Sequence, residues 1–508
     1  MLEHLFAALP AVIFSWQGVL AMVVSTGAGI IIGALPGLSA TMGVALLIPF
    51  TFGMDSLTAL LAMAGMYNGA IYGGSISAIL LNIPGTPAAV CTTLDGYPMA
   101  KRGDGVLALQ AGVICSCVGG VLSALSLMLI APYLAQLALR FGPAEYFWVA
   151  VLGLSTIASF LSGSTLKGLI SGFIGLLIST FGTDAITGVP RFDFGTSYLL
   201  DGVPQLVALI DLFSIPEVYI ILEKSGLKQG VKDIHLAASR GWDWVRDSTA
   251  SVSIWIRSSL IGIIIGIMPG AGANIAAFIS YNDARQRSKT PEKFGTGFID
   301  GVKAAETANN AVTASALAPM LTFGVPGNAV AAVMIGGLMV HGLQPGPNLF
   351  VKEPIVVYGL MWGMLLTNFI MLFFGLLGSR LFAKCLLIPP TLMAAAILVL
   401  CCVGTYSINN TLGDVFAMLI CGFIGVLMLR LRIPVAPAVL GIILGGMAEN
   451  EFRRALLLAD SFLDLFIRPL SAVLIALTLL SLAVPIIKGV KKRKAGVVEE
   501  EMSGGIEF

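Results

Sequence analysis

The chain contains the stretch Gly29-Ile-Ile-Ile-Gly33-Ala-Leu-Pro36-Gly37-Leu-Ser-Ala40 and repeats it as Gly262-Ile-Ile-Ile-Gly266-Ile-Met-Pro269-Gly270-Ala-Gly-Ala273. In both copies Pro-Gly breaks an apolar run that otherwise favours a helix, because proline lacks a backbone N–H and clashes with the preceding turn. Paired apolar segments interrupted by glycine and proline, at corresponding positions of two halves, are typical of the binding sites of secondary transporters. The stretch therefore predicts a membrane carrier built around broken helices.

The composition places the chain in membrane lipid. Of its 508 residues 57% are apolar and only 11% are charged, against roughly 25% charged residues in soluble domains. Several stretches without a charged residue can each hold a span of about 20 residues. These stretches are 106–139, 355–379, 385–413 and 469–487. They are too long for barrel strands, so we expect an all-α polytopic membrane protein with about ten to twelve transmembrane segments.

Other classes of protein find no support in the sequence. A net charge of +1 and scattered basic residues argue against a nucleic-acid partner. The seven cysteines show neither metal-ligand nor redox spacing, which predicts free thiols. The chain has no His-Glu-x-x-His, no Gly-x-Ser-x-Gly and no phosphate-binding loop that ends in Gly-Lys-Ser/Thr. We therefore expect no enzymatic activity, no catalytic residues and no cofactor.

The repeat extends along the chain. Ile83-Pro84-Gly85-Thr86 corresponds to Val325-Pro326-Gly327-Asn328, and Gly172-Phe-Ile-Gly175 corresponds to Gly422-Phe-Ile-Gly425. The offsets of the three motifs are 233 (29 to 262), 242 (83 to 325) and 250 (172 to 422). A slow rise in one direction is expected of a duplicated unit with small loop insertions. We divide the chain into a first repeat (1–224), a connector (225–251), a second repeat (252–487) and a tail (488–508).

Loop charges indicate that the two repeats are inverted. Basic residues follow the second break in the first half but the first break in the second half. The residues concerned are Asp55, Lys101 and Arg102 in the first half, and Arg285, Arg287, Lys289, Lys293, Lys352 and Glu353 in the second. By the positive-inside rule, corresponding loops then lie on opposite sides of the membrane. The same rule places the basic connector and the C-terminal tail in the cytoplasm.

The helix breaks are the first candidate binding residues. A break frees backbone groups that must be buried in protein or line a polar cavity. Helix starts after a break suit a substrate carboxylate, and the freed carbonyls of helix ends suit a cation such as Na⁺. The candidates are Pro36, Gly37, Ser39, Thr41, Asn82, Pro84, Gly85 and Thr86, then Pro269, Gly270, Asn274, Gly324, Pro326, Gly327 and Asn328. The alternative is that these residues serve only helix kinks and close packing.

A second candidate group is formed by amides and one carboxyl. Asn68 aligns with Asn310 at the offset of 242, and Asn309 precedes the latter. Neutral amides can bind Na⁺ without a buried charge, or they can form hydrogen bonds between helices. Glu306 lies one helical turn before Asn310 and is a candidate for coupling to Na⁺ or H⁺, since ionisable residues at membrane depth are functional by default. The alternative is a surface-seeking group with Lys303 and Asp300 at the cytoplasmic rim.

Two further motifs predict ordinary structure. Asp95-Gly96-Tyr97-Pro98 is typical of a turn that closes a hairpin. Arg191 is the one basic residue of a loop predicted to be external, and we expect it to form a salt bridge with Asp184 or Asp193.

The chain resembles the large membrane subunit of the bacterial tripartite tricarboxylate transporters over nearly its whole length. The motifs that carry the resemblance are Gly33-Ala-Leu-Pro36-Gly37, Tyr72-Gly73-Gly74-Ser75, Leu81-Asn-Ile-Pro84-Gly85-Thr-Pro87, Asp95-Gly-Tyr-Pro98, Glu306-Thr-Ala-Asn309-Asn310-Ala311, Gly324-Val-Pro326-Gly327, His341-Gly-Leu-Gln-Pro345-Gly-Pro347 and Gly404-Thr-Tyr-Ser407. It departs at Glu306-Thr-Ala, where the family more often has Glu-Ala-Ala.

The resemblance implies a secondary carrier of the bacterial inner membrane, driven by a cation gradient. It implies uptake of citrate or other di- and tricarboxylates from a periplasmic solute-binding protein, together with a small membrane subunit. From the residues alone, a stand-alone carboxylate:cation symporter and an anion channel stay open as alternatives.

Overall fold

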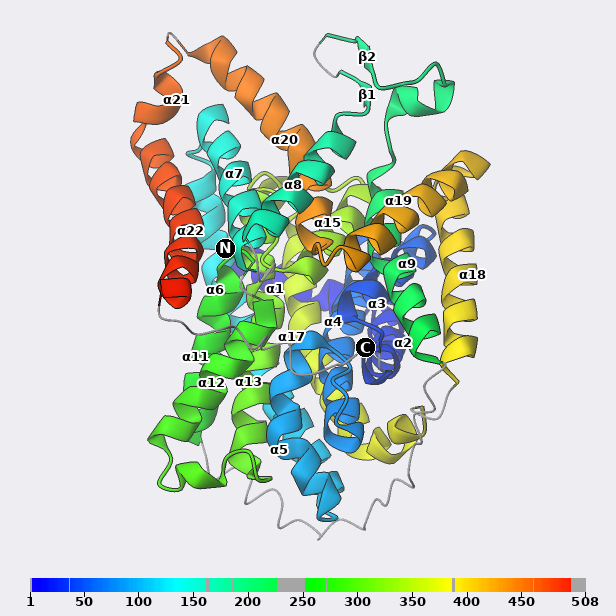
Figure 1. Cartoon of the computed structure of the whole chain (residues 1–508), viewed down its shortest axis with the longest axis vertical. Helices are drawn as coiled ribbons and strands as arrows, with labels where there is room; N and C mark the ends of the chain where they lie inside the picture. The colour runs from blue at the N-terminus through cyan, green and yellow to red at the C-terminus, as the bar shows by residue number, and fades with distance from the viewer. Residues whose placement is uncertain are drawn as a thin grey trace.

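The computed structural model describes residues 2–35, 37–160, 165–184, 187–225, 252–270, 272–385, 389–459 and 461–494. Within them the protein is almost entirely helical, as predicted (Figure 1). The one sheet there pairs β1 (Gly182–Thr183) with β2 (Pro190–Arg191) in antiparallel fashion. Pro36, residues 226–251 of the connector and residues 495–508 of the tail lie outside the described residues.

The helices follow one another in two series of similar order. The first half contains α1 (Leu2–Ile13), α2 (Trp16–Ala34), α3 (Ala40–Leu47), η1 (Ile48–Thr51), α4 (Ser56–Leu81), η2 (Pro87–Ala89), α5 (Val90–Lys101), α6 (Gly105–Ala138), α7 (Pro143–Phe160), α8 (Thr165–Ser179), η3 (Ser197–Asp201) and α9 (Gln205–Ser225). The second contains α11 (Val252–Ile267), α12 (Gly272–Arg287), η4 (Pro291–Lys293), α13 (Ile299–Ser315), α14 (Leu317–Phe323), α15 (Ala329–Val340), α16 (Leu349–Lys352), α17 (Pro354–Cys385), α18 (Pro390–Asn409), α19 (Leu412–Arg430), α20 (Ala436–Leu458), α21 (Asp464–Ile467) and α22 (Pro469–Lys494).

Five helices of the described chain are long and apolar enough to cross a membrane unbroken. They are Trp16–Ala34, Gly105–Ala138, Pro354–Gly378, Thr391–Asn409 and Leu412–Arg430. Further apolar helices are shorter, among them α3, α11 and α15, because each begins or ends at a break. Length and composition alone therefore account for fewer crossings than the ten to twelve expected from the sequence, and that number stays a prediction.

Helix contacts recur between the two halves. By the sequence offsets, α2 corresponds to α11, α4 to α13 with α14, α6 to α17, α8 to α19, and α9 to α20 by order. α2 packs on α4, and α11 packs on α13. Each half also packs on the other: α4 lies on α17 and α13 on α6, while α8 lies on α20 and α19 on α9. The halves are thus interlocked rather than side by side.

The repeated glycines permit these contacts. A Cβ atom at Gly33 of α2 would lie 2.0 Å from the carbonyl oxygen of Ala70, and one at Gly262 of α11 would lie 2.5 Å from that of Ala308. In the third motif, a Cβ at Gly175 would lie 1.9 Å from the Ala438 oxygen, and one at Gly425 would lie 3.0 Å from the Leu212 oxygen. Only glycine lets these backbones approach so closely, as in other membrane helix pairs.

Ion pairs join the β1–β2 hairpin to α20 at one end of the molecule (top of Figure 1). Arg191 lies 2.8 Å from Glu449 and 3.7 Å from Asp184, and Arg453 lies 2.8 Å from Asp184. The predicted pair with Asp184 is thus present, and the shorter contact to Glu449 is an addition. The hydrogen bond that the Arg191 guanidinium donates to the Glu449 carboxylate raises the pKa of Arg191, which stays charged.

The predicted turn at Asp95-Gly96-Tyr97-Pro98 is wrong, because these residues lie within α5. Asp95 is fully buried, and its Oδ1 accepts hydrogen bonds from the backbone N–H groups of Gly295 (2.9 Å), Gly297 (2.8 Å) and Phe298 (2.7 Å). Its Oδ2 accepts a further one from Tyr281 Oη at 2.8 Å. Asp95 therefore holds the loop between α12 and α13 of the second half against α5 of the first.

We expect Asp95→Ala to destabilise the protein by at least about 3 kcal/mol, because hydrogen bonds to a charged group contribute about 1.5–3 kcal/mol each and their donors would stay buried. The measurement is the melting temperature of the detergent-purified protein. Asp104→Ala is the matched control, since the Asp104 side chain makes no capping hydrogen bond at the start of α6. Equal melting temperatures of the two variants would contradict the role given to Asp95.

Candidate site at the helix breaks

The first break has the same backbone form in both halves. α2 ends at Ala34 and α3 begins at Ala40, and α11 ends at Ile267 and α12 begins at Gly272. Gly37 has φ +88° and Gly270 has φ +81° between these helices. Glycine alone adopts this region without a steric cost, so it turns the chain where the helix is interrupted.

The second break is also built alike in the two halves. Asn82 (φ 60°) ends α4 and Gly324 (φ 71°) ends α14, both in the left-handed conformation. Gly85 then donates its N–H to the Gly74 oxygen at 3.2 Å. In the second half Gly327 donates to the Ala316 oxygen, also at 3.2 Å. Each chain segment thus folds back on the helix that it has just left.

The two breaks of each half touch one another. A Cβ atom at Gly85 would lie 2.0 Å from the Gly33 oxygen, and one at Gly327 would lie 2.7 Å from the Gly266 oxygen. In the second half Gly270 also donates its N–H to the Gly327 oxygen at 2.9 Å. In each half the structure therefore brings the first and second breaks into contact, and the contact is built from corresponding residues of the two halves.

The residues that follow the breaks differ in their hydrogen bonds. Ser39 caps α3 by accepting from Met42 N at 3.2 Å. Asn328 caps α15 by accepting from Ala331 N at 2.9 Å, and its amide nitrogen donates to Tyr67 Oη of α4 at 2.7 Å. Thr86 is buried and its hydroxyl has no partner among the described residues.

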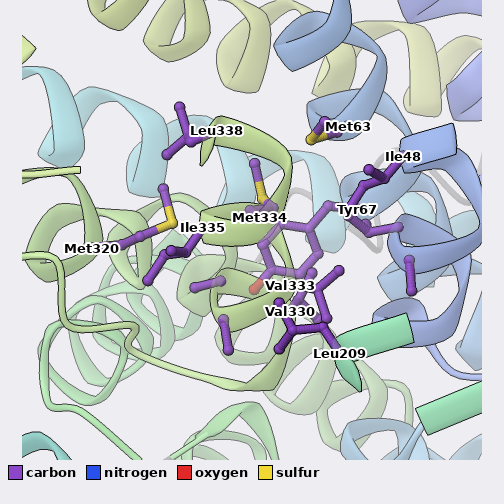
Figure 2. Close-up of a cluster of buried hydrophobic side chains, with 14 of the residues drawn as sticks. Ile48, Met63, Tyr67, Leu209, Met320, Val330, Val333, Met334, Ile335 and Leu338 are labelled. Atoms are coloured by element: carbon purple, nitrogen blue, oxygen red, sulfur yellow. The ribbon is translucent and has the colours of Figure 1, made fainter. Parts of the chain in front are cut away.

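Tyr67 joins the second-half break to the first half. In Figure 2 its ring lies beside Val330 and Val333 of α15, near Leu209 of α9. The tip of α15 is thus packed between α4 and α9 in an apolar cluster. Sequence analysis did not select Tyr67, although it stands next to Asn68 in the aligned motif.

The remaining break candidates are less enclosed or carry no distinctive contact. Thr41 is buried in α3, Pro326 is buried, and Pro84 is partly exposed. Asn82 and Asn274 are exposed in this chain.

The side chains of Asn68 and Asn310 are each directed toward a helix of the other half. Asn68 donates to the Met364 oxygen at 3.1 Å and to Thr367 Oγ1 at 2.8 Å on α17. Asn310 donates to Ser116 Oγ on α6 at 2.8 Å. Their nitrogens therefore form the interhelical hydrogen bonds of the alternative interpretation, while their amide oxygens have no partner among the described residues.

Glu306 lies at the crossing of α13 with α5 and α6 and is fully buried. Its carboxylate accepts hydrogen bonds from the hydroxyl of Thr92 and, at 3.1 Å, from that of Ser116. Lys303 lies 3.0 Å from Asp300, and no salt bridge to Glu306 is formed within the described ranges. Glu306 is thus separate from the rim pair that the sequence suggested as an alternative.

Polar atoms without partners surround this carboxyl. The side chain of Asn309 lies next to Glu306, yet neither of its amide atoms completes a hydrogen bond of ordinary geometry. Tyr72 is near Glu306 as well, and its buried hydroxyl has no partner in the described chain. At the offset of 242 the counterpart of Glu306 is Ala64, so this polar group has no equivalent carboxyl in the first half.

A metal centre of the His, Cys, Asp and Glu type is absent from the described residues, where no group of three such side chains meets. The oxygens around Glu306 are instead of the kind that hard cations prefer. Thr92 and Ser116, which hold the carboxyl, were missed by sequence analysis because nothing in the local sequence links them to a residue some 200 positions later.

These features define a helical membrane protein with broken helices. Comparison with known families makes the class specific: the chain matches the family described as the tripartite tricarboxylate transporter TctA family over residues 19–440. The chain belongs to this family, as the resemblance in its motifs predicted, and is therefore a multi-pass membrane transporter rather than an enzyme.

Two proteins of Agrobacterium vitis are similar to the chain. One, described as an uncharacterized 52.8 kDa protein in the TAR-I ttuC' 3'region, is 35% identical over 475 residues, which are 93% of this chain and 94% of that protein. The other, an uncharacterized protein in the TAR-II ttuC' 3'region, is 32% identical over 241 residues, 47% of this chain and all of that protein. No solved structure matches the chain.

We expect Gly85→Ala to destabilise the protein by about 1–3 kcal/mol or more, since the added methyl group meets backbone atoms that cannot move without displacing α2. Melting temperature in detergent is the measurement. Gly53→Ala is the matched control, because a Cβ at Gly53 meets nothing within 4 Å. Equal melting temperatures of Gly85→Ala and Gly53→Ala would show that the two breaks do not make this close contact.

Proposed function

We propose that the chain is the large permease subunit of a tripartite secondary carrier in the bacterial inner membrane. It takes up citrate-like di- and tricarboxylates, delivered by a periplasmic solute-binding protein, and works with a small membrane subunit. A gradient of Na⁺ or H⁺ drives the uptake. The observation that carries the proposal is the pair of alike, mutually touching breaks in each half of a TctA-family chain.

The breaks supply the chemistry for an anion. The helix starts at Ser39 and Asn328 are capped by their own side chains, and a substrate carboxylate can take the place of such a cap because unpaired N–H groups and the helix dipole favour negative charge. The helix ends near Asn82 and Gly324 instead present backbone carbonyl groups, whose partial negative charge suits a cation.

Glu306 is the proposed coupling residue. Whereas Asp300, the other carboxyl of α13, pairs with Lys303, Glu306 lies among uncharged hydrogen-bonding groups. Because the first half has no counterpart of Glu306, the two halves differ in ion chemistry. Asn309 and Asn310 offer amide oxygens without partners beside it. Na⁺ bound by these oxygens, or H⁺ bound by the carboxyl, would each relieve the cost of a buried charge.

The two halves are proposed to be inverted repeats. The recurrence of helix contacts supports a duplicated unit, and the loop charges support opposite orientations. In this arrangement the breaks of the two halves approach the membrane midplane from opposite sides, and the C-terminus lies in the cytoplasm.

The test of function is uptake of labelled citrate, and of smaller dicarboxylates, into vesicles that contain the chain and its small subunit. We expect saturable uptake that requires the solute-binding protein and either a Na⁺ or a H⁺ gradient. Gradient-driven uptake without the binding protein would instead establish a stand-alone symporter. Flux without saturation would establish a channel.

In the same vesicles Glu306→Gln should abolish gradient-driven uptake, because the amide keeps the shape of the side chain but carries neither charge nor exchangeable acid proton. Glu353→Gln, on an exposed residue, is the matched control. Uptake by Glu306→Gln with an unchanged ion dependence would remove Glu306 from the coupling mechanism.

Inversion is tested by single cysteines at Met54 and Gln286, which are exposed in corresponding loops. We expect a membrane-impermeant thiol reagent to label Met54→Cys in intact cells and Gln286→Cys only after the membrane is opened. The parent chain, whose described cysteines are buried or partly buried, gives the background. Labelling of both positions from one side would show that the repeats are parallel.

A further inference from the structure

Asp211 on α9 is another carboxyl buried among the helices, and the proposed function leaves it unused. Its side chain is 0% exposed. Thr405 of α18 donates one long hydrogen bond, 3.4 Å, to Oδ2, and Oδ1 has no partner among the described residues. Asp95, by contrast, accepts four hydrogen bonds and Glu306 accepts two.

Among the described residues, the groups near Asp211 carry no positive charge. Arg430 of α19 donates instead to Tyr219, about two turns further along α9. The thiols of Cys401 (α18) and Cys421 (α19) are buried close enough to interact electrostatically with the Asp211 carboxyl. Ser214 lies next to the Cys401 thiol. α3 and α15, which also pack on α9, contain no titratable residue. The charged residues of α20, over 449–454, pair among themselves and with the hairpin.

An ionised carboxylate in these surroundings would be costly. Removing such an ion from water is strongly unfavourable even after the protein relaxes, and the cost is offset only by a counter-ion or by several good hydrogen bonds. Asp211 has neither within the described part of the chain, where no Lys or Arg forms an ion pair with it. The neutral acid avoids the cost, because its O–H and C=O need no compensating charge.

The position of Asp211 links it to the candidate site. Residues two apart on a helix point roughly 200° apart. Leu209 of α9 packs in the cluster with Tyr67 and Val330 at the tip of α15 (Figure 2), so Asp211 lies on the opposite side of the same helix, against α18 and α19. Gain or loss of a proton at Asp211 would therefore change the electrostatic forces on α9, the helix that packs against the break before α15.

We propose that Asp211 is a proton-binding site, protonated in the described conformation, through which a pH gradient acts on the carrier. The ligand is H⁺. The inference rests on the proposed gradient-driven transport, but the protonation itself can be measured without any substrate.

The first experiment is infrared spectroscopy of the detergent-purified protein at neutral pH. The difference spectrum between wild type and Asp211→Asn should contain the absorption of one protonated carboxyl group. A difference spectrum without it overturns the proposal. If Asp211→Asn does not fold, Thr405→Val takes its place: removal of the one hydroxyl donor should shift the band of a protonated carboxyl, and an unshifted spectrum overturns the proposal.

The second experiment measures labelled citrate in vesicles with all three components, without Na⁺. Asp211→Asn should keep citrate exchange across the membrane, but an inward H⁺ gradient should no longer raise uptake above the level without a gradient. Stimulation equal to wild type overturns the proposal. If wild-type vesicles move no citrate in any condition, the proposed function fails on its substrate, while the infrared result still decides the state of Asp211.

Discussion

The structure depends on how its interrupted backbone is satisfied. Within a bilayer no water replaces a lost helix hydrogen bond, so each break must find its partners in protein. Here Gly85 and Gly327 donate to the helices that they leave, and Gly270 donates to Gly327. These hydrogen bonds require the backbones to lie closer together than a Cβ atom at the glycine would allow. The two residues of each Pro-Gly motif therefore have different roles. Proline stops the helix, and glycine allows the following backbone to pack closely against the neighbouring helix.

The same constraint explains the interlocked halves. Polar residues within helices must also be satisfied, and the halves do this for each other: Asn68 of α4 donates to α17, and Asn310 of α13 donates to α6. Asp95 and the loop over 294–298 make a comparable contact outside the breaks. The transport site is consequently formed on a scaffold to which both copies of the repeat contribute.

Much of this architecture was predictable from sequence because it follows from period and repetition. The helical class, the breaks and their pairing are visible in the repeated Gly and Pro positions, and the family follows from the motifs. The contacts of Asp95, Thr92 and Tyr67 were not predictable, since each joins residues some 190 to 260 positions apart that no local pattern connects. Asp95 was assigned to a turn because its neighbours Gly96 and Pro98 are turn formers, and tertiary hydrogen bonds overrode that local preference.

The hydrogen bonds that α4 donates to α17 have a consequence for biosynthesis. Asn68 enters the membrane with α4, yet its acceptors lie 296 and 299 residues later in the chain. Until the ribosome has delivered α17, this amide must remain in the insertion machinery, near lipid headgroups or with a temporary partner. The first half is therefore an unfinished membrane protein throughout its synthesis, and its quality control must tolerate that state until the second half arrives.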